Sequence, residues 1–326
     1  MSRIGPEYDA GSEVNRRLAI LWGTISLLTA CRSSANSADV ESISTTDVHH
    51  FVTAFASWTP KDTACRALEP YWRTATRGLR SYANKFDVAD ADLCRRIRQT
   101  PARYARLATL LPSLDSAAAE IRGIYAKFDT LHPLTNHPAV YFVVGNGISG
   151  GSTTRGRHPV ILIGTELLDS ARGVPRIVAH ELVHTQQDYP FMGSLTGGPT
   201  FLRGSLLRHS ITEGSADFIA SLLLGRPFTN TWAESHEDSL WAEFQRDAHS
   251  RDYRRWLYNG WNRKALGDRP PDLGYWMGYR ITQAYYDRAR DKRQAITDIL
   301  SIRDFDDFLK ASGYRGDTLV GASAKP

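Results

Sequence analysis

The chain has 326 residues, of which 42% are hydrophobic and 23% charged, and its net charge is +5 at pH 7. Such a composition is typical of a globular protein with a sizeable core, in one large domain or two ordinary ones. Because the lysines and arginines form no run of like charge, nothing in the sequence requires a nucleic-acid partner.

The N-terminus has the pattern of a lipoprotein export signal. Two arginines, Arg16 and Arg17, precede thirteen mostly apolar residues, 18–30, which are too few to span a bilayer and suit a signal peptide. The segment ends in Leu-Thr-Ala-Cys at Cys31, which resembles the lipobox of bacterial lipoproteins, where the cysteine is lipidated and becomes the mature N-terminus. The alternative is a buried N-terminal helix with an incidental cysteine.

We therefore expect an exported protein, anchored by lipid to the cell envelope at Cys31, with a flexible tether over residues 31–46. Residue 32 is Arg32, whereas aspartate there usually retains Gram-negative lipoproteins in the inner membrane, so the outer membrane is favoured. The acidic residues before Val14 suit an export signal poorly, so translation from Val14 rather than Met1 stays open.

Residues 47–130 have the spacing of a helical region. Phe51, Phe55 and Trp58 recur at intervals of four and three residues behind a candidate N-cap at Asp47. Further helices are expected over residues 64–86, over residues 90–98, and on either side of Pro112.

Cys65 and Cys94 lie within two of these expected helices. In an exported protein the pair can form a disulfide, closing a loop of about 30 residues and stabilising the fold by about 3–4 kcal/mol. Two separate buried thiols are equally compatible with the sequence.

Two apolar runs, residues 139–144 and 160–164, predict buried strands of a small sheet. The first leads into Gly-Asn-Gly-Ile-Ser-Gly at residues 145–150, which matches the dinucleotide pattern G-x-G-x-x-G. That fold needs a helix to begin there, and residues 151–159 are too rich in glycine, serine and threonine to form one. We therefore predict a long connection between two strands and no nucleotide cofactor.

Residues 176–187 have helical spacing, follow Pro175, and carry the sequence His-Glu-Leu-Val-His from His180 to His184. On a helix, residues four apart project from one face. Two neutral imidazoles in that arrangement can share one Zn²⁺ ion, and Glu181 beside the metal is a candidate general base.

A second expected helix, residues 211–224, supplies the ligand that the two histidines lack. Glu213 and Asp217 are four residues apart and share a face. We expect Glu213 to be the third protein ligand of one Zn²⁺ per chain, with water in the fourth position. Asp217 is expected to accept the free N–H of a ligating histidine and so fix its tautomer.

H-E-x-x-H followed by E-x-x-x-D resembles the gluzincin, or thermolysin-like, metallopeptidases. Longer strings resemble a narrower family of predicted zinc-dependent proteases of bacteria, which are often lipoproteins. They are His-Glu-Leu-Val-His-Thr-Gln-Gln from His180, Glu-Gly-Ser-Ala-Asp-Phe-Ile-Ala from Glu213 and Leu-Gly-Tyr-Trp-Met-Gly-Tyr-Arg from Leu273. The resemblance covers about residues 135–315, and it implies the metal ligands, base and orienting carboxylate given above.

Hydrolysis of a peptide also needs a donor to the oxyanion of the tetrahedral intermediate. Tyr279 is the first candidate and Tyr275 the second, although both phenols can equally well pack in the core. His209, one turn before the Glu213 ligand, can face the cleft, but a surface role is commoner. The four aromatic residues over 253–261 could line a substrate groove, but packing between helices is the commoner role for such side chains.

Together these features predict a mostly helical α+β protein, in which a zincin-like metallopeptidase domain has a small sheet and an active-site helix. The expected parts are an export signal over 1–30, a tether over 31–46, a helical region over 47–130, the metallopeptidase domain over 131–315 and a flexible tail over 316–326.

The predicted function is hydrolysis of peptide bonds in peptide or protein substrates by a zinc-activated water, outside a bacterial membrane. Two alternatives stay open. One is a non-catalytic envelope protein that keeps the zinc fold for binding or assembly. The other is a zinc hydrolase of a non-peptide amide or ester.

Overall fold

The structure is a computed structural model that describes residues 43–154, 156, 158–190, 204–260 and 266–316. The expected export signal and the lipidation site at Cys31 lie outside these residues, as does nearly all of the expected C-terminal tail. Within the described part, no helix is long and apolar enough to cross a membrane.

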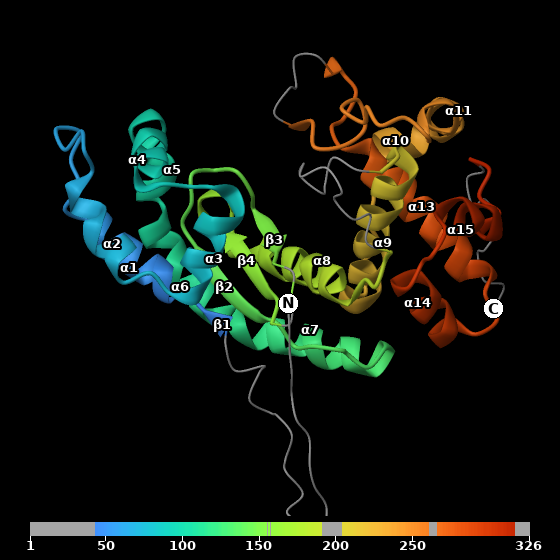
Figure 1. Ribbon diagram of the computed structural model, residues 1–326, viewed down its shortest axis with the longest axis horizontal. Helices are drawn as coiled ribbons and strands as arrows, with labels where there is room; N and C mark the ends of the chain where they lie inside the picture. The colour runs from blue at the N-terminus through green and yellow to red at the C-terminus, as the bar shows by residue number, and fades with distance from the viewer. Residues whose placement is uncertain (1–42, 155, 157, 191–203, 261–265, 317–326) are drawn as a thin grey trace, which may run out of the picture. The chain divides into compact units, whose positions relative to one another are not determined.

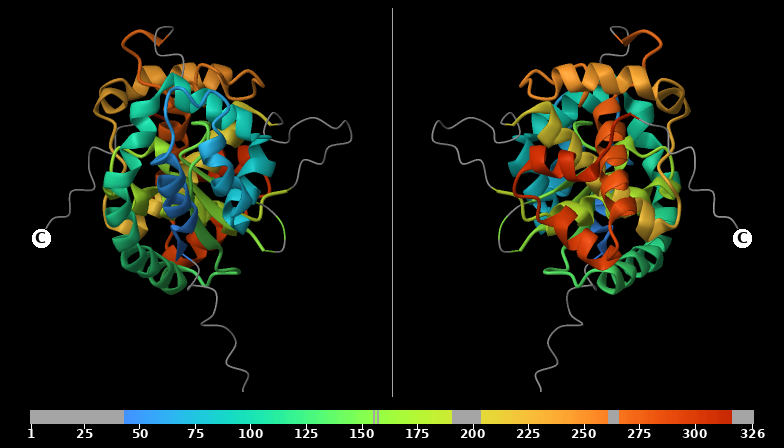
Figure 2. Two further views of the ribbon diagram at one scale, coloured as in Figure 1. Left: turned by 90° about the vertical axis from the view of Figure 1, so that its left-hand side faces the viewer. Right: turned by 90° about the vertical axis from the view of Figure 1, so that its right-hand side faces the viewer.

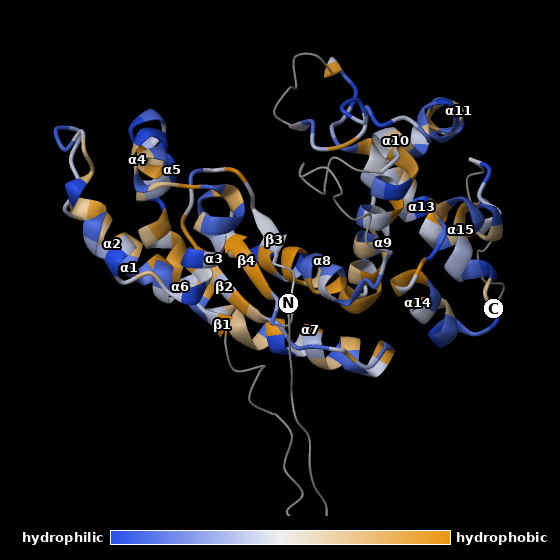
Figure 3. Cartoon of the chain, in the orientation of Figure 1, coloured by the Kyte–Doolittle hydropathy of each residue, from blue (hydrophilic) through white to orange (hydrophobic). Residues whose placement is uncertain are grey.

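Four strands form one sheet in the order β1-β2-β4-β3. The three parallel strands are β1 (Ile43–Ser44), β2 (Ala139–Val143) and β4 (Val160–Gly164), and β3 (Gly151–Thr153) pairs antiparallel with β4 at the edge. All five residues of β4 are buried, as expected for a central strand covered on both faces. Figure 3 shows β2 and β4 as the apolar centre of this part of the fold.

The segment before Ala139 is helical, as predicted. Its helices are α1 (Thr46–Phe55), α2 (Glu69–Arg73), α3 (Arg77–Phe86), α4 (Asp90–Gln99), α5 (Pro101–Ala105), α6 (Leu107–Ser116) and α7 (Ala118–Leu131). The single helix expected over residues 64–86 is divided, because Cys65 adopts a left-handed conformation and Thr76 caps a new helix by accepting from the Gly78 N–H. Pro112 lies inside α6 rather than between two helices.

The described residues all belong to one compact unit. Helices α1 and α3 contact β2, while α8 (Val174–Gln186) contacts β3 and β4, so the sheet lies between them (Figures 1 and 2). The Tyr71 hydroxyl, in α2, donates to the Val144 carbonyl at 2.7 Å just beyond β2. β1 belongs to this unit, although its residues were expected in the tether.

After α8 the described part of the chain is mostly helical again. Its helices are α9 (Leu206–Leu224), α10 (Thr231–Ser235), α11 (Glu237–Asp247), α13 (Leu273–Arg288), α14 (Lys292–Leu300) and α15 (Phe305–Ser312). Twelve of the nineteen residues of α9 are buried, so α9 is central, with α8 and α13 packed against it. The mostly helical α+β class, the small sheet and the helical N-terminal region are confirmed, whereas a zincin fold is not shown.

Helices α9 and α13 approach until their backbones touch, because glycines lie at the contact. A Cβ atom on Gly278 would lie 1.7 Å from the Ser210 carbonyl oxygen, and one on Gly214 would lie 2.1 Å from the Tyr279 nitrogen. Glycine is therefore required on both helices next to Glu213.

Cys65 and Cys94 are joined by a disulfide, with their Cα atoms 5.7 Å apart. The bond connects the turn before α2 to α4 and spans 29 residues of sequence. Of the two arrangements compatible with the sequence, the structure therefore has the bonded one.

Replacing both cysteines by alanine is expected to lower the free energy of unfolding by about 2–4 kcal/mol, because the unfolded chain regains the freedom that the closed loop removes. Chemical denaturation of the oxidised protein measures the loss. As a control, a reductant should destabilise the wild type by a similar amount and leave the double variant unchanged. A loss below about 1 kcal/mol would contradict the prediction.

Candidate metal centre

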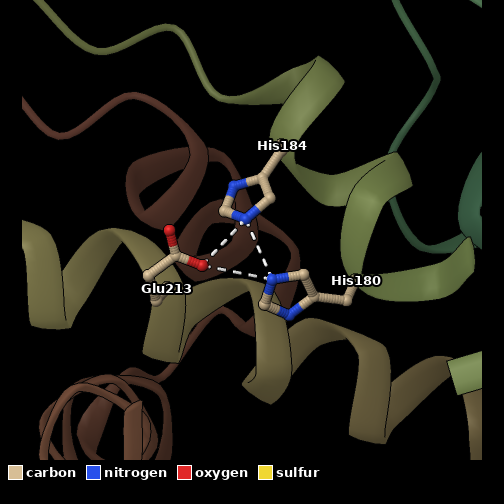
Figure 4. Close-up of side chains that lie close together, drawn as sticks. All are labelled: His180, His184 and Glu213. Carbon is tan, nitrogen blue, oxygen red and sulfur yellow. Dashed lines mark hydrogen bonds and ion pairs between the residues drawn. The ribbon is translucent and has the colours of Figure 1, made fainter. Parts of the chain in front are cut away.

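Three side chains from two helices converge on one point (Figure 4). The Nε2 atoms of His180 and His184, both on α8, are 2.9 Å apart. The Oε2 atom of Glu213, on α9, lies 3.2 Å from the first nitrogen and 3.1 Å from the second. Within the described residues, this is the group of histidine, cysteine and acidic side chains with the spacing to hold a metal ion.

The local fold explains the convergence. Helix α8 begins with Pro175 in its first turn and places the two histidines on the face toward α9. Each of the three side chains is only about 15% exposed, with values of 14% for His180, 16% for His184 and 15% for Glu213. The centre is therefore mostly shielded from solvent but still reachable.

Each imidazole has a hydrogen-bond acceptor behind it. His180 Nδ1 lies 3.2 Å from Asp217 Oδ1, and His184 Nδ1 lies 2.8 Å from Gln187 Oε1. Because a carboxylate oxygen and an amide oxygen only accept, both Nδ1 atoms must carry the proton. Asp217 thus lies where the sequence predicted it, whereas the role of Gln187 was missed.

The orientation of the Gln187 amide is set by its other end. Its Nε2 donates to the Thr212 carbonyl at 2.9 Å and to Ser215 Oγ at 3.1 Å, both on α9. The amide oxygen therefore faces His184. Asp217 is likewise on α9, so the helix that carries Glu213 orients His180 directly and orients His184 through Gln187.

These hydrogen bonds determine the protonation of the two Nε2 atoms, which face each other and Glu213 Oε2. A neutral imidazole has one N–H, so with both Nδ1 atoms protonated, both Nε2 atoms present lone pairs inward. A carboxylate oxygen of Glu213 completes a set of three lone pairs about 3 Å apart. Such a set repels itself unless a cation lies between its members.

The donor set fits Zn²⁺. Zinc binds histidine nitrogen and carboxylate oxygen at about 2.0–2.2 Å in a tetrahedral arrangement, which places neighbouring ligand atoms about 3.4 Å apart. The observed separations of 2.9–3.2 Å are close to that value. Three protein ligands would leave the fourth position of the metal open.

Without a metal, a proton would occupy the same place. Burial lowers the pKa of His180, but the carboxylates of Asp217 and Glu213 outweigh it and raise that pKa well above its ordinary value. Burial raises the pKa of Glu213, but the two imidazoles outweigh it and hold that pKa well below its ordinary value. The centre is therefore built to hold positive charge.

Glu181, the candidate base, lies beside the centre in a cavity of about 410 Å³ that is also lined by His180 and Arg176. Burial raises the pKa of its carboxyl. The edge strand β3 approaches this carboxyl at Gly151, where a Cβ atom would lie 2.4 Å from Ile177 Cγ2 and 3.0 Å from Glu181 Oε1. Only glycine at this position lets the strand lie so close.

The two predicted tyrosines have different places. Tyr275 lines the cavity, and its ring stacks over the ring of His180 at 6.1 Å. Tyr279, the first candidate, packs among Phe218, Phe228 and Trp276, with its ring centroid within 6.0 Å of each. The structure therefore places Tyr279 in the core and Tyr275 at the site, which reverses the expected order.

Tyr258 makes a hydrogen bond to a predicted metal ligand, because its hydroxyl donates to Glu213 Oε1 at 2.9 Å. The sequence placed it among four aromatic residues expected to pack between helices, and no spacing distinguished it from the others. His209, which the sequence allowed to face the cleft, packs against the ring of Tyr253 at 4.7 Å. It does not belong to the converging group.

Replacing Asp217 by alanine is expected to weaken zinc binding by about 10-fold to 100-fold, the usual cost of losing a group that orients a metal-binding histidine. Competition with a chromogenic chelator measures the dissociation constant. Asp217→Asn keeps an oxygen that can accept from His180, so it should lose less than the alanine variant. Equal affinities for Asp217→Ala and the wild type would contradict this role.

Comparison with known proteins finds one family model, that of the gliding motility protein GldB, which matches residues 227–316. The match covers less than a third of the chain and so indicates similarity in that part alone. It includes α13 and Tyr258 but none of the three converging residues. No curated protein and no solved structure matches the chain.

These comparisons contradict the resemblance to gluzincin metallopeptidases and to the narrower family of bacterial zinc-dependent proteases. The matching family is described by gliding motility, and no peptidase family was found. The interpretation of the chain as a protease or metalloprotease is therefore wrong, and a peptide substrate has no support. The geometry of the centre does not depend on that assignment.

Proposed function

We propose that the chain is a zinc-binding lipoprotein of the cell envelope that acts by binding or assembly. The observation that carries the proposal is the set of three lone pairs, from His180, His184 and Glu213, directed at one point. The partial similarity to the gliding motility protein GldB supports an envelope role, and so does the lipobox-like sequence that ends at Cys31.

Binding is favoured over a purely structural role for the metal because structural zinc sites usually have four protein ligands. Here α8 and α9 supply three, and the cavity of about 410 Å³ lies next to them. A polar group of a partner or small ligand can therefore enter the cavity and complete the coordination. A metal bound by these three residues would also link α8 to α9.

Metal analysis of the purified, folded protein tests the proposal. We expect about one zinc per chain, removed by a strong chelator and recovered when zinc is added back. Absence of stoichiometric zinc after such reconstitution would overturn it. Cell fractionation tests the envelope part, since Cys31→Ala should move the protein out of the membrane fraction.

A second candidate function, hydrolysis of a non-peptide amide or ester, is favoured by the position of Glu181. A zinc ion held by His180, His184 and Glu213 would supply a Lewis acid that activates water and polarises a carbonyl group. Glu181 lies in the cavity beside His180 and can accept a proton from a nucleophile and return it to the leaving group. Tyr275 lines the same cavity and can donate a hydrogen bond to the substrate.

Glu181→Gln separates the two functions. If the protein is a hydrolase, the variant should lose about 10²-fold to 10⁴-fold in turnover and keep its zinc. If it is a binding protein, neither the wild type nor the variant should hydrolyse a panel of amides and esters. Turnover by the wild type that the variant loses would establish the hydrolase and exclude the purely binding role.

A further inference from the structure

The two oxygens of Glu213 have different neighbours. Oε2 faces the two histidines, while Oε1 accepts the hydrogen bond from the Tyr258 hydroxyl at 2.9 Å. A carboxylate can bind a metal through one oxygen or through both. The Tyr258 hydrogen bond engages the second oxygen and so leaves Oε2 as the oxygen available to the metal.

Tyr258 is held in a conformation that its residue type disfavours. Its φ angle is +56°, in the left-handed region that a bulky side chain rarely adopts. The surrounding structure must therefore impose this conformation, and such residues concentrate at functional sites. The residue as a whole is 41% exposed, so Tyr258 is not a core residue.

The constraint comes from a reciprocal pair of hydrogen bonds, the Asn259–Asp272 clip. The Asn259 N–H donates to Asp272 Oδ1 at 3.0 Å, and the Asp272 N–H donates to Asn259 Oδ1 at 2.8 Å. The Asn259 side chain also donates to the Arg254 carbonyl at 2.9 Å and is buried. The clip joins the residue after Tyr258 to the start of α13.

The ring of Tyr258 is held from the side by two other tyrosines. Its centroid lies 6.1 Å from that of Tyr253 and 6.2 Å from that of Tyr275, both in edge-on contact. The Tyr275 ring in turn stacks over the ring of His180. Backbone and ring are therefore both fixed, and the hydroxyl is directed at Glu213.

We propose that Tyr258 is a positioning residue that makes Glu213 bind the metal through Oε2 alone, and that the Asn259–Asp272 clip acts through it. The inference rests on the proposed zinc binding and adds a control over its affinity and ligand number. The segment similar to GldB, residues 227–316, contains Tyr258 and the clip, so the inference gives this segment a role in metal binding. That segment would position Glu213, although the three predicted metal ligands all precede it in the sequence.

Tyr258→Phe tests the proposal because it keeps the ring and removes only the hydroxyl. We expect the dissociation constant for Zn²⁺, measured by chelator competition, to rise about 10-fold to 100-fold. With Co²⁺ in place of zinc, the visible absorption should also change, since it depends on the number of ligands and Glu213 would be free to bind through both oxygens. A purely structural role would leave that spectrum unaltered.

Tyr285→Phe is the matched control. The Tyr285 hydroxyl donates to Asp298 Oδ2 at 2.8 Å, the same kind of bond, between α13 and α14. Its loss should leave both the zinc affinity and the cobalt spectrum unchanged. If Tyr258→Phe also leaves them unchanged while the wild type binds zinc, the inference fails and the proposed function stands. If the wild type binds no zinc, the proposed function fails first.

The role of the clip is tested by combining variants. Asn259→Ala should weaken zinc binding in the wild-type background and have no further effect in Tyr258→Phe, because the clip acts only through the hydroxyl that is already missing. Additive losses in the double variant would overturn this part. Should Asn259→Ala fail to fold, Asp272→Ala, which removes the other acceptor of the clip, takes its place in the same cycle.

Discussion

Replacing His184 by alanine is expected to weaken zinc binding by more than about 100-fold. Removing a group that only orients a ligand costs about 10-fold to 100-fold, and removing the ligand itself must cost more. Two ligands would remain, His180 and Glu213, too few to hold zinc in a tetrahedral site. Chelator competition at neutral pH measures the change.

His137→Ala is the control, since His137 Nε2 lies 2.9 Å from Asp129 Oδ2 and so makes a histidine–carboxylate contact like those of the centre. It should bind zinc as the wild type does. Thermal unfolding provides a second measurement, because free zinc at 100 times the dissociation constant stabilises a protein by about 2.7 kcal/mol. A zinc-dependent rise in Tm that survives in His184→Ala would contradict the assignment of the ligand.

Gly278→Ala is expected to lower the free energy of unfolding by about 3 kcal/mol or more, at or above the top of the usual range for overpacking. The added methyl group would lie 1.7 Å from the Ser210 carbonyl oxygen, and a backbone atom cannot move aside as a side chain can. Helix α13 would have to move away from α9. Because Glu213 lies one turn after Ser210 on α9, zinc binding should weaken as well.

Gly123→Ala is the matched control for that substitution. Gly123 lies within α7, and a Cβ atom there would have nothing within 4 Å. Alanine should therefore stabilise the helix by up to about 1 kcal/mol. Chemical denaturation of the two variants measures both effects, and a destabilisation of Gly278→Ala no larger than 1 kcal/mol would contradict the close packing of α9 on α13.

Short-range geometry was predictable from the sequence. His180 and His184 share a face of α8, and Glu213 and Asp217 share a face of α9, because residues four apart on any helix do so. The strands β2 and β4 follow from their apolar runs in the same way. In each case the pattern lies within one element, so no knowledge of its neighbours was needed.

The family assignment shows the limit of such patterns. The residues of H-E-x-x-H and E-x-x-x-D specify which atoms can meet around a metal, and the structure brings them together. They constrain few of the other residues of the chain, and the family match falls on a different segment, residues 227–316. A short motif therefore supports the chemistry of a centre better than the ancestry or substrate of the protein.

By itself the sequence determined the faces of α8 and α9 and the chemical types of the groups on them. Only the tertiary structure decided that Gln187 orients His184, that Tyr258 rather than Tyr279 contacts the centre, and that Cys65 is bonded. The physical reason is that periodicity fixes the direction of a side chain within its own helix. The contacts of a loop, and the side of one helix that faces another, depend on long-range packing.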